Sequence, residues 1–136
     1  MRNATLWPLA TALLTASAAL AGEGEVFDVG KELAGAGQGR RAVSLGLVRQ
    51  PEYTVNAVAV NDEIPTHRHE DGSHVLYIVS GRGTAIVDGA PVALKTGLLV
   101  HIPKGVPHSI KAEGERLTFV DFVHHGADPG RSEKRK

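Results

Sequence analysis

The 136-residue chain contains no cysteine. It therefore forms no disulfide bond, and it has no thiolate to act as a metal ligand, as a nucleophile or as the attachment point of a lipid anchor. Aromatic residues are also scarce, at 4% of the chain. We therefore expect the stability of the fold to come from buried aliphatic side chains.

An excess of charge is missing as well. The 15 Lys and Arg residues balance 15 Asp and Glu residues, which gives a formal net charge of zero at pH 7. No basic stripe runs through the chain, although its last six positions include four basic residues, Arg131, Lys134, Arg135 and Lys136. A chain with this charge distribution is not expected to bind nucleic acid.

Residues 1–21 have the composition of a secretory signal peptide. A short positive start precedes the apolar, small-residue-rich run Ala4–Leu20, and Ala19-Leu20-Ala21 forms an A-x-A cleavage signature before Gly22. An uncleaved anchor is the alternative, but the run is barely long enough to span a bilayer and contains Trp7-Pro8. We therefore expect a periplasmic or secreted protein without a stable membrane anchor.

The remaining chain divides into three parts. A glycine-rich lead-in occupies residues 22–40, in which Val26 to Leu33 suits either a short strand or one helical turn, and a basic tail occupies residues 126–136. Between them, residues 41–125 show a steady β pattern without an internal repeat, which predicts one domain. The expected strands are Ala42–Arg49, Tyr53–Val60, His74–Ser80, Thr84–Asp88, Pro91–Leu94, Leu98–Ile102, His108–Lys111 and Arg116–Val123. Many short strands without a long helix predict an all-β sandwich or barrel.

Four histidines stand at spacings that suit one shared metal ion: His67, His69, His74 and His108. On a β-strand, His67 and His69 would point the same way, with roughly 7 Å between their Cα atoms. Turn residues 70–73 can return His74 to their side, and a proline-rich corner precedes His108. Since histidine is the commonest ligand of transition metals, we interpret the four as one metal site.

The two stretches that carry these histidines resemble the paired motifs of the cupin superfamily. His67, His69 and Gly81 stand in register with the first motif, and Gly97, Pro103, Gly105 and His108 with the second. Three positions depart from the motifs: His74 replaces a glutamate, Asn61 replaces a glycine, and Ala112 replaces an asparagine. Asn61 is a mild departure, since asparagine tolerates left-handed backbone geometry.

The resemblance implies a cupin-type double-stranded β-helix, or jelly-roll, barrel over residues 41–125, with the metal inside its mouth and a homodimer as the default assembly. It says little of the reaction, because cupins include dioxygenases, decarboxylases, isomerases, lyases, binding modules and storage proteins.

Imidazole in place of the carboxylate changes the expected chemistry. Four neutral imidazoles leave the +2 charge of the ion uncompensated, which favours an anionic ligand or substrate. A nitrogen-only ligand set favours one divalent transition metal among Fe, Ni, Cu and Zn, with Mn still possible.

Other polar residues have weaker claims on the site. His101 and Asn56 are candidates for the pocket, and Asp121 is a candidate to orient a ligand histidine. For each of the three, the alternative is an ordinary position on a strand with no role in the site. Strand alternation from His67 and His69 points Glu70 outward.

Three classes of function follow. We favour an exported metal-dependent enzyme of oxygenase type that acts on a small anionic substrate, although no general base stands out. A non-catalytic periplasmic module that binds a metal or small ligand, and a cupin with a purely structural metal, remain as alternatives.

Overall fold

The computed structural model describes residues 23–126, so the predicted signal peptide and all but the first residue of the basic tail lie outside the described residues. The described part confirms the all-β prediction, with nine strands and one short helix. The elements are α1 (Val29–Leu33), β1 (Ala42–Arg49), β2 (Tyr53–Val60), β3 (Glu63–His67), β4 (Ser73–Ser80), β5 (Arg82–Val87), β6 (Ala90–Lys95), β7 (Leu99–Ile102), β8 (His108–Ala112) and β9 (Leu117–His124). None of the helical structure within residues 23–126 is long and apolar enough to cross a membrane.

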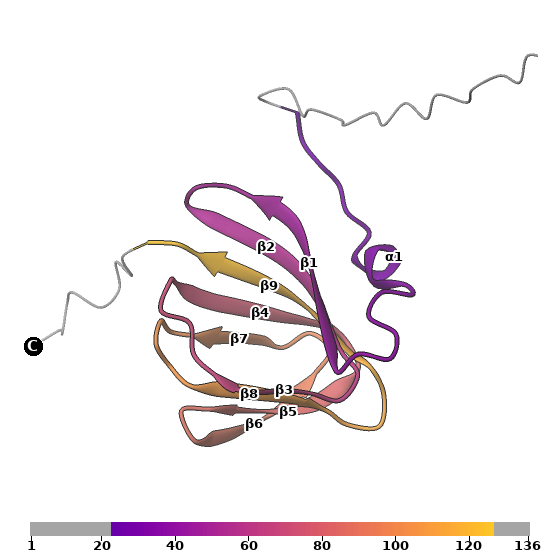
Figure 1. Ribbon diagram of the computed structural model, residues 1–136, viewed down its shortest axis with the longest axis vertical. Helices are drawn as coiled ribbons and strands as arrows, with labels where there is room; N and C mark the ends of the chain where they lie inside the picture. Colours follow the sequence, from indigo (N-terminus) through magenta and orange to yellow (C-terminus); the bar gives the residue numbers. More distant parts are fainter. Residues whose placement is uncertain (1–22, 127–136) are drawn as a thin grey trace, which may run out of the picture.

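The strands form two antiparallel sheets that face each other (Figure 1). One sheet has the order β1-β2-β9-β4-β7 and the other the order β3-β8-β5-β6. Aliphatic side chains from both sheets fill the space between them, including Val60, Ile78, Leu94 and Leu117. The fold is therefore a barrel with a continuous aliphatic core, as the double-stranded β-helix prediction requires.

Alternation along β2 shows why one sheet has two different faces. Val58 and Val60 point into the barrel core, whereas Ala57 and Ala59 pack with Leu33 of α1 on the outer face. The small alanines leave room for the helix, and side chains on successive positions of a strand point to opposite faces. The lead-in segment therefore covers the outside of β1 and β2, as Figure 1 shows.

Two side chains fasten this lead-in to the barrel. Arg116 donates from its guanidinium to the carbonyls of Leu33 and Ala36, and the amide of Asn61 donates to the carbonyls of Gly37 and Arg40. Asn61 is not in the left-handed region, where Asp88 is the one non-glycine residue among those described, with φ 51°. The left-handed role considered for Asn61 is therefore wrong, and its amide serves as an anchor.

The strand predictions agree with the structure except at β3. Strands β1 and β2 have the expected bounds, and the other six expected strands differ from the structure by one or two residues at their ends. Strand β3 lies at the edge of its sheet, and its register shifts between Ile64 and His67, a stretch that contains Pro65. Proline removes a ladder hydrogen bond and is tolerated at edges and bulges, so the local pattern hides this strand.

Candidate metal centre

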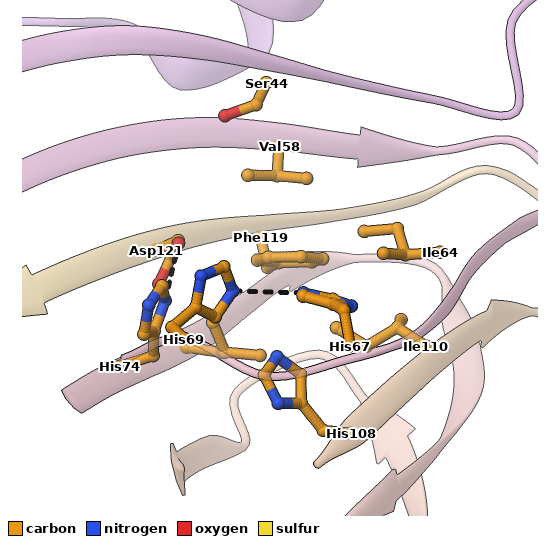
Figure 2. Close-up of a pocket in the computed structure, with 11 residues that line it drawn as sticks. Ser44, Val58, Ile64, His67, His69, His74, His108, Ile110, Phe119 and Asp121 are labelled. Atoms are coloured by element: carbon orange, nitrogen blue, oxygen red, sulfur yellow. Dashed lines mark hydrogen bonds and ion pairs between the residues drawn. The ribbon is translucent and has the colours of Figure 1, made fainter. Parts of the chain in front are cut away.

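The four histidines gather at one end of the barrel (Figure 2). His67 ends β3 and lies opposite His108, the first residue of β8, in the pairing of the two strands. His74 comes from β4 in the other sheet, and His69 from the segment after β3. The ring centroids lie 4.3 Å apart for His67 and His108 and 4.0 Å apart for His69 and His74. Residues from two sheets and one loop thus lie together, with His69 between His74 on one side and the pair His67 and His108 on the other.

His69 reaches this position by a different route from the one expected. Strand β3 ends at His67, so strand alternation does not position His69. Instead, the carbonyl of His69 accepts a hydrogen bond of 2.8 Å from the amide of Gly105. Gly72 then lies so close to the carbonyl of His124 that a Cβ atom there would overlap it. The connection to β4 is therefore held against both neighbouring segments, which fixes where the imidazole of His69 stands.

Hydrogen bonds set which ring nitrogens are free. The Nδ1 atoms of His67 and His108 lie 2.8 Å from the carbonyl of Pro65 and 2.9 Å from that of Val106. Because a carbonyl only accepts, each Nδ1 must carry the proton and donate it. The Nε2 atom of each neutral ring then keeps its lone pair, which is the form that binds metal.

His74 is oriented by a carboxylate. Its Nδ1 atom lies 2.9 and 3.1 Å from the two carboxylate oxygens of Asp121, and both side chains are largely buried, with exposed fractions of 7% and 13%. The Nε2 atom on the other side of the ring is buried and has no hydrogen-bond partner among the described residues. A buried nitrogen with a free lone pair is costly unless something binds it.

The nitrogens that face one another fit a metal ion. The Nε2 atoms of His67 and His69 are 3.0 Å apart. One ligand atom from each of His67, His69 and His108 lies within 4.8 Å of the others, and the same holds for His69, Asp71 and His74. The donor set, the short separation of two nitrogens and the unpartnered Nε2 of His74 all suit a transition metal.

The electrostatics favour the neutral form of two of the rings, those of His69 and His108. Burial lowers the pKa of His69 below the usual 6.5, and the charges of His74, His67 and His108 lower it further, whereas Asp71 raises it. Burial also lowers the pKa of His108, against the opposing effect of its hydrogen bond to Val106. Rings with lowered pKa values are unprotonated at neutral pH and so are ready to bind metal.

The other sequence candidates lie in different places. Asn56 is paired with Asp121 across β2 and β9 and is partly buried, but it is not among the residues that line the cavity. His101 is exposed and paired with Val75. It belongs to the outer face, because the neighbouring Ile102 is paired with His74 and points inward, so its placement in the pocket is wrong. Glu70 is exposed, as expected.

Asp71 is the residue that sequence reasoning missed. It is exposed, yet its carboxylate lies within 4.8 Å of ligand atoms of His69 and His74. The sequence Glu70-Asp71-Gly72-Ser73 suggests only a turn, and the acidic residues of a turn usually face solvent. Its position two residues after His69 and three before His74 was the only available signal.

A cavity of about 160 Å³ opens beside the histidines. Its wall is mostly apolar and includes Val58, Ile64, Leu76, Ile110 and Phe119. Figure 2 shows Ser44 above this wall, on β1. A small ligand can therefore reach the four rings while its body contacts aliphatic and aromatic carbon.

The comparisons with known proteins agree on the fold. A family model described as a cupin domain matches residues 55–123. Quercetin 2,3-dioxygenase of Bacillus subtilis is 27% identical over 106 residues, which cover 77% of this chain but only 30% of that protein. A Klebsiella pneumoniae protein with a double-stranded β-helix domain superposes with a TM-score of 0.67 at 21% identity, over 77% of this chain and 93% of its own. A Thermus thermophilus protein gives the same TM-score at 18% identity, over 75% and 98% of the two chains.

Proposed function

The chain belongs to the cupin family, and from that premise we propose that it is an exported, metal-dependent enzyme of oxygenase type that acts on a small anionic substrate. One observation supports the metal most directly: the Nε2 atom of His74 is buried, is oriented by Asp121, and has no hydrogen-bond partner in the part of the chain that the structure describes. In the loaded protein His67, His69, His74 and His108 hold the ion.

The number of histidines is compatible with a site that has open positions. Four histidines would occupy four positions of a six-coordinate ion and leave two for substrate and a second ligand, whereas a tetrahedral ion would be closed. The Nε2 atoms of His67 and His69 are 3.0 Å apart, so the two rings are close enough to share one ion.

The ligand chemistry favours a redox-capable ion. Nitrogen ligands suit Fe, Ni, Cu or Zn, and Mn is a further candidate. The bound ion supplies Lewis acidity and, for a redox metal, an electron. The resemblance to a quercetin 2,3-dioxygenase supports oxygenase-type chemistry, although the chain spans less than a third of that protein.

The residues of the chain have separate tasks in this proposal. Asp121 holds the proton on Nδ1 of His74, so that Nε2 faces the ion as a neutral donor. The apolar wall excludes water from the substrate. Asp71 stands at the edge of the site and is the exposed carboxylate best placed to take or release a proton.

A non-catalytic module that binds a metal or small ligand is the second candidate. Within the described residues, the cavity lining contains no acid–base group apart from the histidines and Asp121, which is already bonded to His74. A site built for binding alone needs no further group. A purely structural metal is the third candidate, and it would require a closed coordination shell.

We also propose a homodimer formed through the outer face of the five-stranded sheet. Tyr77 and Leu99 lie opposite each other on β4 and β7 and are 49% and 64% exposed. Phe122 on β9 is 38% exposed and stacks on Tyr53. Large apolar side chains grouped on one face are typical of an interaction surface.

Elemental analysis and metal-edge X-ray absorption test these proposals on untagged protein from its native compartment. We expect Fe, Cu, Ni or Mn with four nitrogen ligands and one or two exchangeable oxygens. Mass spectrometry of the intact protein should give the mass of a chain whose first residue is Gly22. Four-coordinate zinc with nitrogen ligands alone would indicate a structural site. A mixture of metals at less than one equivalent would favour the non-catalytic binding module. A purified chain that still starts at Met1 would contradict the export proposal.

A further inference from the structure

We propose that the ligand of this site is a compact monoanion with an apolar body, the size of one six-membered ring, without hydroxyl groups or a second charge on that body. The inference rests on the proposed metal function and deepens it. It depends on three features of the cavity: its charge, the chemistry of its wall and its volume.

The charge of the loaded site matches one negative charge. A divalent ion contributes +2 and four neutral imidazoles contribute nothing, but the largely buried carboxylate of Asp121 contributes −1 through its hydrogen bond to His74. Within the described residues, no Lys or Arg lines the cavity. Asp71 lies at the edge of the site, where its exposure to solvent weakens its charge without removing it. The net charge is therefore at most about +1, which attracts a monoanion and has nothing to balance a second carboxylate.

The wall disfavours polar substituents. Val58, Ile64, Leu76, Ile110 and Phe119 offer no hydrogen-bond donor or acceptor in their side chains. A hydroxyl placed against them would lose its water and gain no partner, which weakens binding. Ser44 is the one hydroxyl of the lining, and it is exposed on β1. The body of the ligand must therefore be apolar where it contacts the wall.

The volume sets the size of that body. The cavity holds about 160 Å³, and an apolar cavity of about 150 Å³ lined by Leu, Ile and Phe holds benzene. One ring or a short branched chain fits this space. Quercetin, the compound in the name of the Bacillus subtilis relative, is a multi-ring molecule with several hydroxyl groups and matches neither the volume nor the wall of this cavity.

Three benzoates that share one ring test the inference. We would load mature protein with Co²⁺, whose visible absorption reports ligand binding, and titrate benzoate, 3,5-dihydroxybenzoate and isophthalate. The hydroxyls of 3,5-dihydroxybenzoate are meta to the carboxylate and cannot chelate the ion, so this compound tests only whether the wall disfavours hydroxyl groups. Isophthalate tests whether the site disfavours a second negative charge. We expect benzoate to bind at least about tenfold more tightly than either, a difference of about 1.4 kcal/mol, because the added hydroxyls or the added carboxylate would lose water without gaining a partner.

Variants then assign the selectivity to named residues. Val58→Thr places a hydroxyl in the wall and should narrow the gap between benzoate and 3,5-dihydroxybenzoate several-fold. Val55→Thr is the matched control, since Val55 lies on the same strand but is paired with the outer-face residue Phe122; it should leave the gap unchanged. If Val58→Thr does not fold, Ile64→Thr at a partly buried position replaces it. Asp121→Asn should shift preference toward isophthalate.

The outcomes separate this inference from the proposal on which it rests. Failure to bind Co²⁺ stoichiometrically would overturn the metal site and the inference together. Stoichiometric Co²⁺ with equal or tighter binding of the dihydroxylated or doubly charged compound would overturn the inference alone. Selectivity that Val58→Thr and Asp121→Asn both leave unchanged would also overturn it.

Discussion

The two ends of the barrel interior differ although the same strands build both. On β4 the inward side chains run from His74 through Leu76 to Ile78, and on β9 from Asp121 through Phe119 to Leu117. Followed from the histidine end, each strand presents a polar side chain to the interior first and apolar side chains after it. On each strand, the polar residue of the site and the first apolar residue are therefore only two positions apart. The histidine end can therefore change its chemistry while the aliphatic end maintains the fold.

The two ends also differ in energetic terms. The aliphatic end consists of fully buried side chains such as Ile78 and Leu117, each with 0% exposure. The histidine end places rings close together and leaves Nε2 of His74 without a hydrogen-bond partner among residues 23–126. One end therefore stabilises the folded chain by itself, whereas the other needs an ion to become favourable. Four changes test this contrast, from the largest expected effect to the smallest.

Removal of two ligands should eliminate metal binding and leave the fold. In the double variant His67→Ala with His69→Ala, two of four donors are lost, and we expect no stoichiometric metal after dialysis. The free energy of unfolding of the metal-free protein should stay within about 1 kcal/mol of wild type, because both rings lie outside the aliphatic core. Elemental analysis and chemical denaturation measure the two quantities.

The exposed His101 provides the control for that variant. His101→Ala should keep a full equivalent of metal. A double variant that also keeps one equivalent would place the site elsewhere.

Truncation at the aliphatic end should have the opposite result. Ile78→Ala removes a side chain with 0% exposure, and the cavity left behind should lower the free energy of unfolding by about 2–5 kcal/mol. Folded protein should still bind one equivalent of metal, since the histidines are unchanged. Denaturation of the metal-free form gives the first quantity, and a variant as stable as wild type would contradict the division between the ends.

Asp121→Asn should weaken the metal site without unfolding the barrel. The amide can donate to Nδ1 of His74, which would favour the wrong tautomer, and we expect metal affinity to fall about 10–100-fold. A competition titration with a chelator measures it. Asp62→Asn is the control, because Asp62 is an exposed carboxylate paired with Arg41; an equal effect of both changes would exclude a specific role for Asp121.

The smallest effect is the pH dependence of the metal-free protein. The pKa values of His69 and His108 are lowered in the folded state, so below about 6.5 the unfolded chain binds more protons than the folded one. Stability should therefore fall as the pH drops below 6.5 and level off below the lowered pKa values.

Denaturation curves between pH 7.5 and about 4.5 measure this dependence. His108→Gln should weaken it, because one of the two groups with a lowered pKa is then lost. A stability that rises as the solution is acidified would show that the two pKa values are raised instead.

The sequence predicted more of the fold than of the site. Alternation and turn residues define β1 and β2 to the residue, because a half-buried strand is a local pattern. The same reasoning did not predict strand β3, because Pro65 interrupts the pattern of this edge strand. The sequence did not predict whether Asp121 faces into the barrel or out of it, because both faces of Leu117–Val123 are apolar. The pairing of β9 with β2 and β4 determines which face is inside.

The convergence of the histidines depends on long-range pairing. His67 meets His108 through the register of β3 and β8, which lie 41 residues apart in the chain. Spacing within each motif and the proline-rich corner before His108 suggested one shared metal site, and the family resemblance supported this link, but the register that joins the two strands could not be read from the sequence. No sequence motif predicted that the carboxylate of Asp71 would lie at the edge of the site.

The order of strands has a consequence for how fast the barrel forms. Strand β9 is the last in the described chain, yet it lies in the middle of the five-stranded sheet, between β2 and β4. A chain that emerges from its N-terminus therefore exposes the edges of β2 and β4 until residues 117–124 arrive. Pairing between such distant segments makes folding slow, in the millisecond-to-second range of all-β domains. The unfinished sheet is then the state in which the chain is most open to chaperones and to aggregation.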